Sequence, residues 1–192
     1  CSLQVKGGGI VNIPSGAQVS CGGILTVDQG GTIKVKTGGI LRIESGGQMQ
    51  LLAGGNGSVT VDSGGQVICY GTITASDTLY AKKFSTVQVQ SGGQLTLNSG
   101  GTVVLDTSAQ LTNYGTTTIN SGGIVDTKKL SIVLTQSGGT TRVNSGGLLK
   151  IWGDATSNSA TLDCYGTLST NGTINGDGSF IIRSGGKLRA DS

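Results

Sequence analysis

Four cysteines are the side chains in this sequence best suited to chemistry, and they stand far apart. They are Cys1, Cys21, Cys69 and Cys164. A zinc site is not expected, because the chain has no histidine and no Cys-x-x-Cys pair. An even number of cysteines in a chain rich in Gly, Ser, Thr and Asn is more typical of disulfides in an exported protein. The sequence therefore predicts an extracellular or cell-envelope location, with all four cysteines as cross-link candidates.

The other side chains offer little for catalysis. Without histidine, neither a Ser-His nor a Cys-His pair can form. The ten acidic residues are dispersed one at a time, whereas a β-helical glycosidase needs paired carboxylates. We therefore expect no enzymatic activity, no cofactor and no metal.

Charge and hydropathy also restrict the partners. The formal net charge is only +3 and the lysines are scattered, so a nucleic-acid partner is not expected. No apolar run approaches the length of a membrane span, which needs about 20 residues. Two sequons, at Asn56 and Asn171, are glycosylation candidates that fit an exported protein.

An eight-residue repeat runs along the chain. Gly-Gly pairs begin at positions 22, 30, 38, 46 and 54, and the same step joins the pairs at 92 and 100 and those at 138 and 146. Between them apolar and polar residues alternate, as in Leu25-Thr26-Val27 and Leu41-Arg42-Ile43, which is the pattern of a half-buried strand. Glycine reaches positive φ without steric cost and so allows a tight turn after each strand. The sequence predicts an all-β fold, a β-solenoid or a stack of β-arches.

Some units are shortened to six residues. In each of them an apolar residue is followed two positions later by Cys21, Cys69, Asn113 or Cys164, so these four residues are expected to share one inward slot. The shortened units delimit a super-repeat of about 46 residues within a single repeat domain, 1–192. Its approximate units are 21–69, 70–113, 114–164 and a truncated 165–192.

Two segments break the eight-residue period. They are "AKKFSTVQVQSGG" at 81–93 and "TKKLSIVLTQSGG" at 127–139, each with a pair of lysines. Phe84, Trp152 and the tyrosines show no regular spacing of a stacking platform, and we expect them to cover corners between strands.

Two geometries fit the repeat, and they place the cysteines differently. Two or three sides of eight residues would give a solenoid coil of 16 or 24 residues, in which Cys1 pairs with Cys21. Alternatively, each 46-residue unit forms one serpentine layer, in which Cys21 and Cys69 are adjacent and Cys164 reaches the next subunit. The super-repeat favours the second geometry.

Both ends of the sequence carry strand patterns and no evident cap. A terminal coil without a cap offers an unpaired sheet edge. The expected partner is therefore a second copy of the chain, joined head-to-tail, with lateral contacts as a further option.

The units "VNSGG", "VDSGG", "LNSGG" and "VQSGG" resemble the Ser-Gly-Gly repeats of bacterial autotransporter adhesin passengers. The combination of β-arches with cysteines at repeated slots resembles the tubular sheath proteins of filamentous methanogenic archaea. The second resemblance implies amyloid-like hoops held by disulfides, with Cys1, Cys21, Cys69 and Cys164 as the cross-links. The N-terminal "CS" also resembles a lipoprotein start, which would make Cys1 a lipid anchor.

Together these patterns favour a structural protein that assembles at the cell surface into fibres, hoops or a sheath. The alternative function is that of an adhesin-type solenoid, a binding module.

Overall fold

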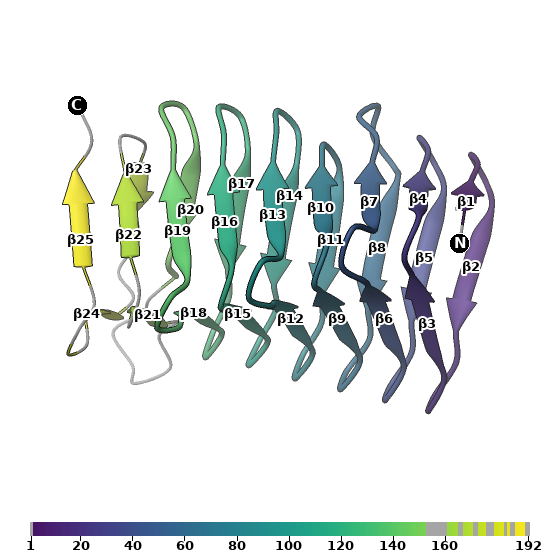
Figure 1. The fold of residues 1–192 in the computed structure, drawn as a ribbon, viewed down its shortest axis with the longest axis horizontal. Coiled ribbons are helices and arrows are strands. Elements are labelled where there is room, and N and C mark those ends of the chain that lie inside the picture. Colours follow the sequence, from purple (N-terminus) through teal and green to yellow (C-terminus); the bar gives the residue numbers. More distant parts are fainter. Residues whose placement is uncertain are drawn as a thin grey trace.

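A computed structural model describes residues 2–152, 161–164, 167–170, 173–175, 179–182, 184 and 187–190. All regular structure in these residues is β-strand, arranged in three parallel sheets that run along the long axis of the molecule (Figure 1).

The strands of the three sheets are short, and nearly all have four residues. Sheet A contains β1 (Ser2–Val5), β4 (Ile24–Val27), β7 (Gln48–Leu51), β10 (Thr72–Ala75), β13 (Gln94–Leu97), β16 (Thr116–Ile119), β19 (Thr140–Val143), β22 (Thr167–Thr170) and β25 (Lys187–Ala190). Sheet B contains β2 (Ile10–Ile13), β5 (Thr32–Val35), β8 (Ser58–Val61), β11 (Thr78–Ala81), β14 (Thr102–Leu105), β17 (Ile124–Thr127), β20 (Leu148–Lys150) and β23 (Thr173–Asn175). Sheet C contains β3 (Gln18–Cys21), β6 (Ile40–Ile43), β9 (Gln66–Cys69), β12 (Thr86–Val89), β15 (Gln110–Asn113), β18 (Ile132–Thr135), β21 (Thr161–Cys164) and β24 (Ser179–Ile182).

The chain visits sheets A, B and C in turn, so three consecutive strands make one coil of a solenoid. Leu3 lies opposite Leu25, and Leu25 lies opposite Met49, so the first coils advance by 22 and 24 residues. The predicted β-solenoid is therefore confirmed, with three sides. The serpentine layer of 46 residues, which the super-repeat favoured, is wrong.

The core follows from the alternation within each strand. In most strands the second and fourth residues are buried, while the first and third face outward, as in β5 and β8. The inward residues of all three sheets form one continuous apolar cluster along the axis. Burial of these aliphatic side chains against the coils on either side is the main source of stability.

Most corners between strands have four residues and carry glycine at the third and fourth positions. The third glycine adopts a positive φ, for example 70° at Gly38 and 73° at Gly64. The fourth passes so close to the preceding coil that a side chain would not fit. A Cβ on Gly47 would lie 2.3 Å from the carbonyl oxygen of Cys21.

Corners from sheet C to sheet A alternate between two lengths. Two residues suffice between β3 and β4, between β9 and β10 and between β15 and β16, whereas four residues join β6 to β7, β12 to β13 and β18 to β19. One super-repeat is therefore a pair of coils, the first closed by a short corner and the second by a long one.

Candidate functional site

The predicted inward slot exists as a column at the end of sheet C. Cys21 lies opposite Ile43, and Ile43 lies opposite Cys69. Further along, Asn113 is paired with Thr135, which in turn is paired with Cys164. Successive residues of the predicted slot are thus two coils apart, with a residue of the intervening coil between them.

This separation corrects the expected adjacency of Cys21 and Cys69. Two coils of about 4.8 Å place them roughly 10 Å apart, beyond the Cα separation of about 7 Å that a disulfide tolerates. Ile43 fills the position between them. A bond between Cys21 and Cys69 is therefore excluded within one chain.

The cysteines differ in what the structure shows. Cys69 is a free thiol with no exposed surface, whereas Cys21 is buried and is not a free thiol. Cys1 lies outside the described residues. For Cys164 the structure describes only its place in β21.

Cys69 is placed to close a short corner. Its Sγ donates to the carbonyl oxygen of Gly71 at 3.2 Å and to that of Gln94 at 3.5 Å. Burial raises the pKa of the Cys69 thiol to about 11, so the thiolate needed for disulfide exchange is scarce at neutral pH.

Asn113 also bonds to the residue two positions on at the next short corner, but there it accepts a hydrogen bond where Cys69 donates one. Its Oδ1 accepts from the backbone N–H of Gly115 at 3.1 Å. Its Nδ2 donates to the carbonyl oxygen of Thr140 at 2.7 Å and to Thr141 Oγ1 at 3.0 Å. A small polar side chain thus bonds to the residue two positions on, whether it is cysteine or asparagine. This explains why Asn113 and Cys69 share one slot.

A different corner, between sheets B and C, carries the most unusual surface of the molecule. Its third position holds Gly16, Gly38 and Gly64 in the first three coils, all with positive φ. The next three coils have Phe84, Ser108 and Leu130 there, with φ of 60°, 58° and 57°. For a bulky residue this conformation costs on the order of 1 kcal/mol relative to glycine.

Serine hydroxyls hold the two bulky turns closed. Ser85 Oγ donates to the carbonyl oxygen of Lys82 at 2.6 Å, and Ser131 Oγ donates to that of Lys128 at 2.7 Å. Both serines are buried and replace the fourth glycine of the other turns. The lysine-pair segments that break the sequence period are therefore ordinary corners with altered residues.

The side chains of these turns point outward. Phe84 is 58% exposed, Leu130 45% and Trp152 36%. Lys83 Nζ lies 4.9 Å from the ring centre of Phe84, and Lys129 Nζ lies 5.4 Å from that of Trp152. We call this surface the lysine ridge, which comprises Lys82, Lys83, Phe84, Lys128, Lys129, Leu130 and Trp152.

Charges alternate in the first position of the same turns. Asp62 lies between Lys36 and Lys82, with N–O distances of 3.2 and 2.8 Å. The hydrogen bond from Lys82 is the main reason why the pKa of Asp62 lies below its usual range. Lys128 Nζ lies 2.8 Å from Asp126 Oδ2.

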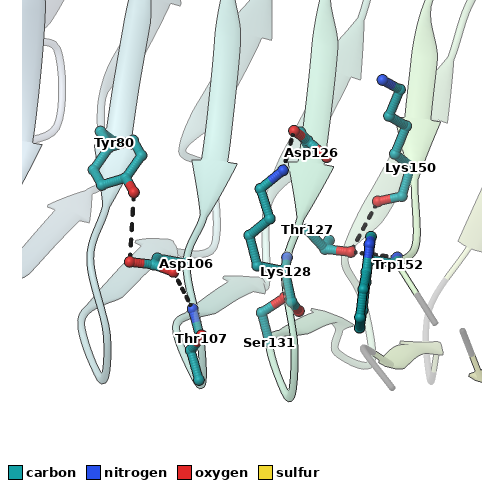
Figure 2. Close-up of polar contacts among 9 residues, drawn as sticks. All are labelled: Tyr80, Asp106, Thr107, Asp126, Thr127, Lys128, Ser131, Lys150 and Trp152. Atoms are coloured by element: carbon teal, nitrogen blue, oxygen red, sulfur yellow. Dashed lines mark hydrogen bonds and ion pairs between the residues drawn. The ribbon is translucent and has the colours of Figure 1, made fainter. Parts of the chain in front are cut away.

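Asp106 and Thr127 complete the polar contacts along this edge (Figure 2). Asp106 accepts from the Tyr80 hydroxyl at 3.4 Å and from the backbone N–H of Thr107 at 2.7 Å. Burial, assisted by Asp106, raises the pKa of Tyr80. Thr127 Oγ1 donates to the carbonyl oxygen of Lys150 and accepts from the backbone N–H of Trp152, both at 2.9 Å. These bonds position Trp152 on the ridge.

One of the two glycosylation candidates lies in an exposed loop. Asn56, with φ of 72°, belongs to the six-residue corner 52–57 between sheets A and B. Asp77 Oδ2 supports that loop by accepting from the backbone N–H of Gly57 at 3.0 Å. Asn171 lies outside the described residues.

Within the described residues, no group of three His, Cys, Asp or Glu residues is arranged to hold a metal ion. Nor does any helix there have the length and apolar character needed to cross a membrane.

Comparison with known proteins does not assign the chain to a family. No family model and no curated protein matches the chain. One similar solved structure is the TibC-catalysed hyper-glycosylated TibA fragment, residues 55–350. It is 20% identical, and the alignment covers 100% of this chain and 81% of that one, with a TM-score of 0.23. A likeness of this strength carries no argument about function.

The corner role of Asn113 predicts a specific loss of stability. Asn113→Val should lower the free energy of unfolding by about 2 kcal/mol, because it leaves the N–H of Gly115 and the Thr140 carbonyl without their partner. Asn113→Cys, which restores the residue type found at Cys69, should lose less. Denaturant unfolding under reducing conditions measures both, and equal stability of the Val variant and the wild type would contradict the role.

The burial of Cys69 predicts that it does not react in the folded chain. Iodoacetamide at neutral pH should leave the peptide containing Cys69 unmodified, whereas the same reagent in guanidinium should alkylate it fully. Mass spectrometry of the digested protein reads out both states. An interchain disulfide at Cys69 in native material would show that this coil opens during assembly.

Proposed function

We propose that the chain is a non-catalytic, adhesin-type β-solenoid displayed outside the cell, which binds its partner through the lysine ridge. The observation that carries this proposal is the exposure of bulky apolar side chains at Phe84 and Leu130 in turns where glycine would be more stable.

The strain argues for a role beyond folding. The same corner is closed by glycine at Gly38 and Gly64, so the fold itself does not need a side chain there. Bulky residues in the left-handed region that persist without a packing reason are concentrated at functional sites. More than half of the surface of Phe84 is exposed and is therefore accessible to a partner.

The surrounding solenoid supports this assignment. Backbone hydrogen bonds between successive coils hold the turns in place, as in the bond from Ser108 N to the carbonyl oxygen of Lys129 at 3.0 Å. Neighbouring turns are therefore fixed relative to one another, and the ridge is organised before a partner arrives.

Glycine substitution separates the effect of the two turns on stability from their effect on binding. The double variant Phe84→Gly, Leu130→Gly should unfold at a higher denaturant concentration than the wild type, because the strain is relieved by roughly 1 kcal/mol at each turn. It should also lose at least about tenfold in binding to intact cells, since each apolar anchor of this size contributes 1.5–3 kcal/mol when buried, by order of magnitude. Flow cytometry with labelled protein, on bacterial and cultured animal cells, measures the binding.

Ser108→Gly is the matched control, because it removes the same type of strain on the intervening coil without removing an apolar group. It should retain full binding. Undiminished binding of the double variant, or no binding of the wild type to either cell type, would overturn the proposed function.

A second function, self-association into fibres or a sheath, is supported by the way the coils stack. Successive coils pair through parallel strands in the same register, as β5 does with β8 and β8 with β11. A second copy of the chain could extend the sheets by the same kind of pairing. Of the four predicted cross-link residues, Cys164 is the candidate for stapling such an assembly, because Cys21 is not a free thiol and Cys69 is buried.

A charge introduced into β1, which lies at one edge of sheet A in this structure, should prevent the assembly. We expect wild-type protein to form rods longer than one chain, seen by electron microscopy, and Leu3→Lys to remain dispersed. Leu52→Lys, at an exposed loop position away from the edge, serves as the control. A wild type that sediments as a monomer at every concentration would exclude self-association through this edge.

A further inference from the structure

We propose that the partner of the lysine ridge is an anionic lipid surface. This inference rests on the proposed function, because it names the class of partner that the same surface would bind.

The outermost charges of the ridge are positive. Within the described turns of this corner there are five lysines and two aspartates: Lys36, Lys82, Lys83, Lys128, Lys129, Asp62 and Asp106. Asp126 lies beside them in β17. The aspartates are engaged along the base of the turns by lysines, Tyr80 and Thr107. Lys83 and Lys129 stand one position further out, where the other coils have Ser15, Thr37, Ser63 and Thr107. Among the described residues of this corner, the charged side chains at the outermost turn position are therefore lysines.

The apolar residues distinguish a membrane from a soluble polyanion. Besides Phe84 and Leu130, the ridge is bordered by Ile132, which is 37% exposed at the start of β18. The lysines alone would be enough to bind a soluble polyanion, which would not require these apolar side chains. A lipid interface accommodates both features, since apolar tips enter the headgroup region and lysines remain beside the phosphates.

Trp152 extends this apolar group to the next coil. It is held at the corner by Thr127 and lies beneath the ammonium group of Lys129. Tryptophan is enriched at membrane–water interfaces, where one part of the ring is apolar and its N–H is hydrated. The ridge and its border thus combine two aromatic side chains, Phe84 and Trp152, with two aliphatic ones, Leu130 and Ile132. Lysines lie next to these apolar groups.

The shape of the corner suits a flat partner. The turns follow one another along a single edge of the solenoid (Figure 1). Coils repeat at about 4.8 Å, so Phe84 and Leu130, two coils apart, are separated by roughly 10 Å along that edge. Both side chains leave the same turn position with nearly the same φ. They can therefore enter a planar interface together without a conformational change.

Vesicle binding tests the inference with a probe that the chain already contains. Trp152 is the only tryptophan. With vesicles of equimolar phosphatidylcholine and phosphatidylglycerol, we expect a blue shift of its emission and cosedimentation of the protein, and neither with pure phosphatidylcholine. Both signals should weaken as salt is raised, because the attraction is screened.

Charge variants test the ridge itself. Lys83→Gln, Lys129→Gln should lower partitioning onto the anionic vesicles by about 30-fold, since each lysine near such a surface contributes roughly a fivefold effect. Lys83→Arg, Lys129→Arg should bind as the wild type does. The double glycine variant at Phe84 and Leu130 should lose about tenfold or more, whereas Ser108→Gly should lose nothing.

The outcomes separate this inference from the proposed function. Cell binding that depends on the ridge, without vesicle binding, would overturn the lipid surface and leave the binding module intact. Retention on heparin with no binding to vesicles would have the same meaning and identify a polyanion. Absence of both cell binding and vesicle binding in the wild-type protein would reject both proposals. Equal binding to neutral and anionic vesicles would also overturn the inference.

Discussion

The close approach of one coil's backbone to the next is the constraint on which the rest of this structure depends. Where sheet C leads into sheet A, a Cβ on Gly93 would lie 2.3 Å from the carbonyl oxygen of Cys69, and one on Gly115 would lie 2.3 Å from that of Gly93. No other residue fits at such distances. The regular glycines are therefore required by stacking as well as by turning, and the eight-residue spacing follows from four strand residues and four corner residues.

Much of the fold was predictable from this spacing. The alternation of apolar and polar residues correctly gave short strands with one buried face. The number of sides was not determined in the same way, because a short corner at Tyr70–Gly71 and a long one at 90–93 produce a two-coil period. In the sequence that period looks the same as a layer of 46 residues. The odd or even position of a residue within its strand identifies the face on which its side chain lies. It does not identify which strands become neighbours in a sheet.

The candidate site was predictable only in part, for a similar reason. The slot shared by Cys69 and Asn113 was visible from parity, but its role as a corner hydrogen-bonding position required the neighbouring backbone. Phe84 was expected to cover a corner and instead projects from one. A signal was present in the sequence, because "KKFS" at 82–85 occupies the place of "KTGG" at 36–39 and "DSGG" at 62–65. That alignment places Phe84 in the slot of a positive-φ glycine.

A solenoid is well suited to carrying such a strained surface. Each coil contacts only its neighbours, so its stability is approximately a sum of local terms, and a cost at one turn is not amplified elsewhere. The turns at Phe84 and Leu130 are separated by the coil of Ser108, which spaces the two apolar groups. Below the turns, the buried residues Val87 and Val133 continue the core unchanged. The outer position of a corner can therefore change from glycine to a bulky side chain while the inward face is preserved. In the proposed function, binding and folding therefore depend on different residues of the same short unit, so that a partner could be gained or altered without a new fold.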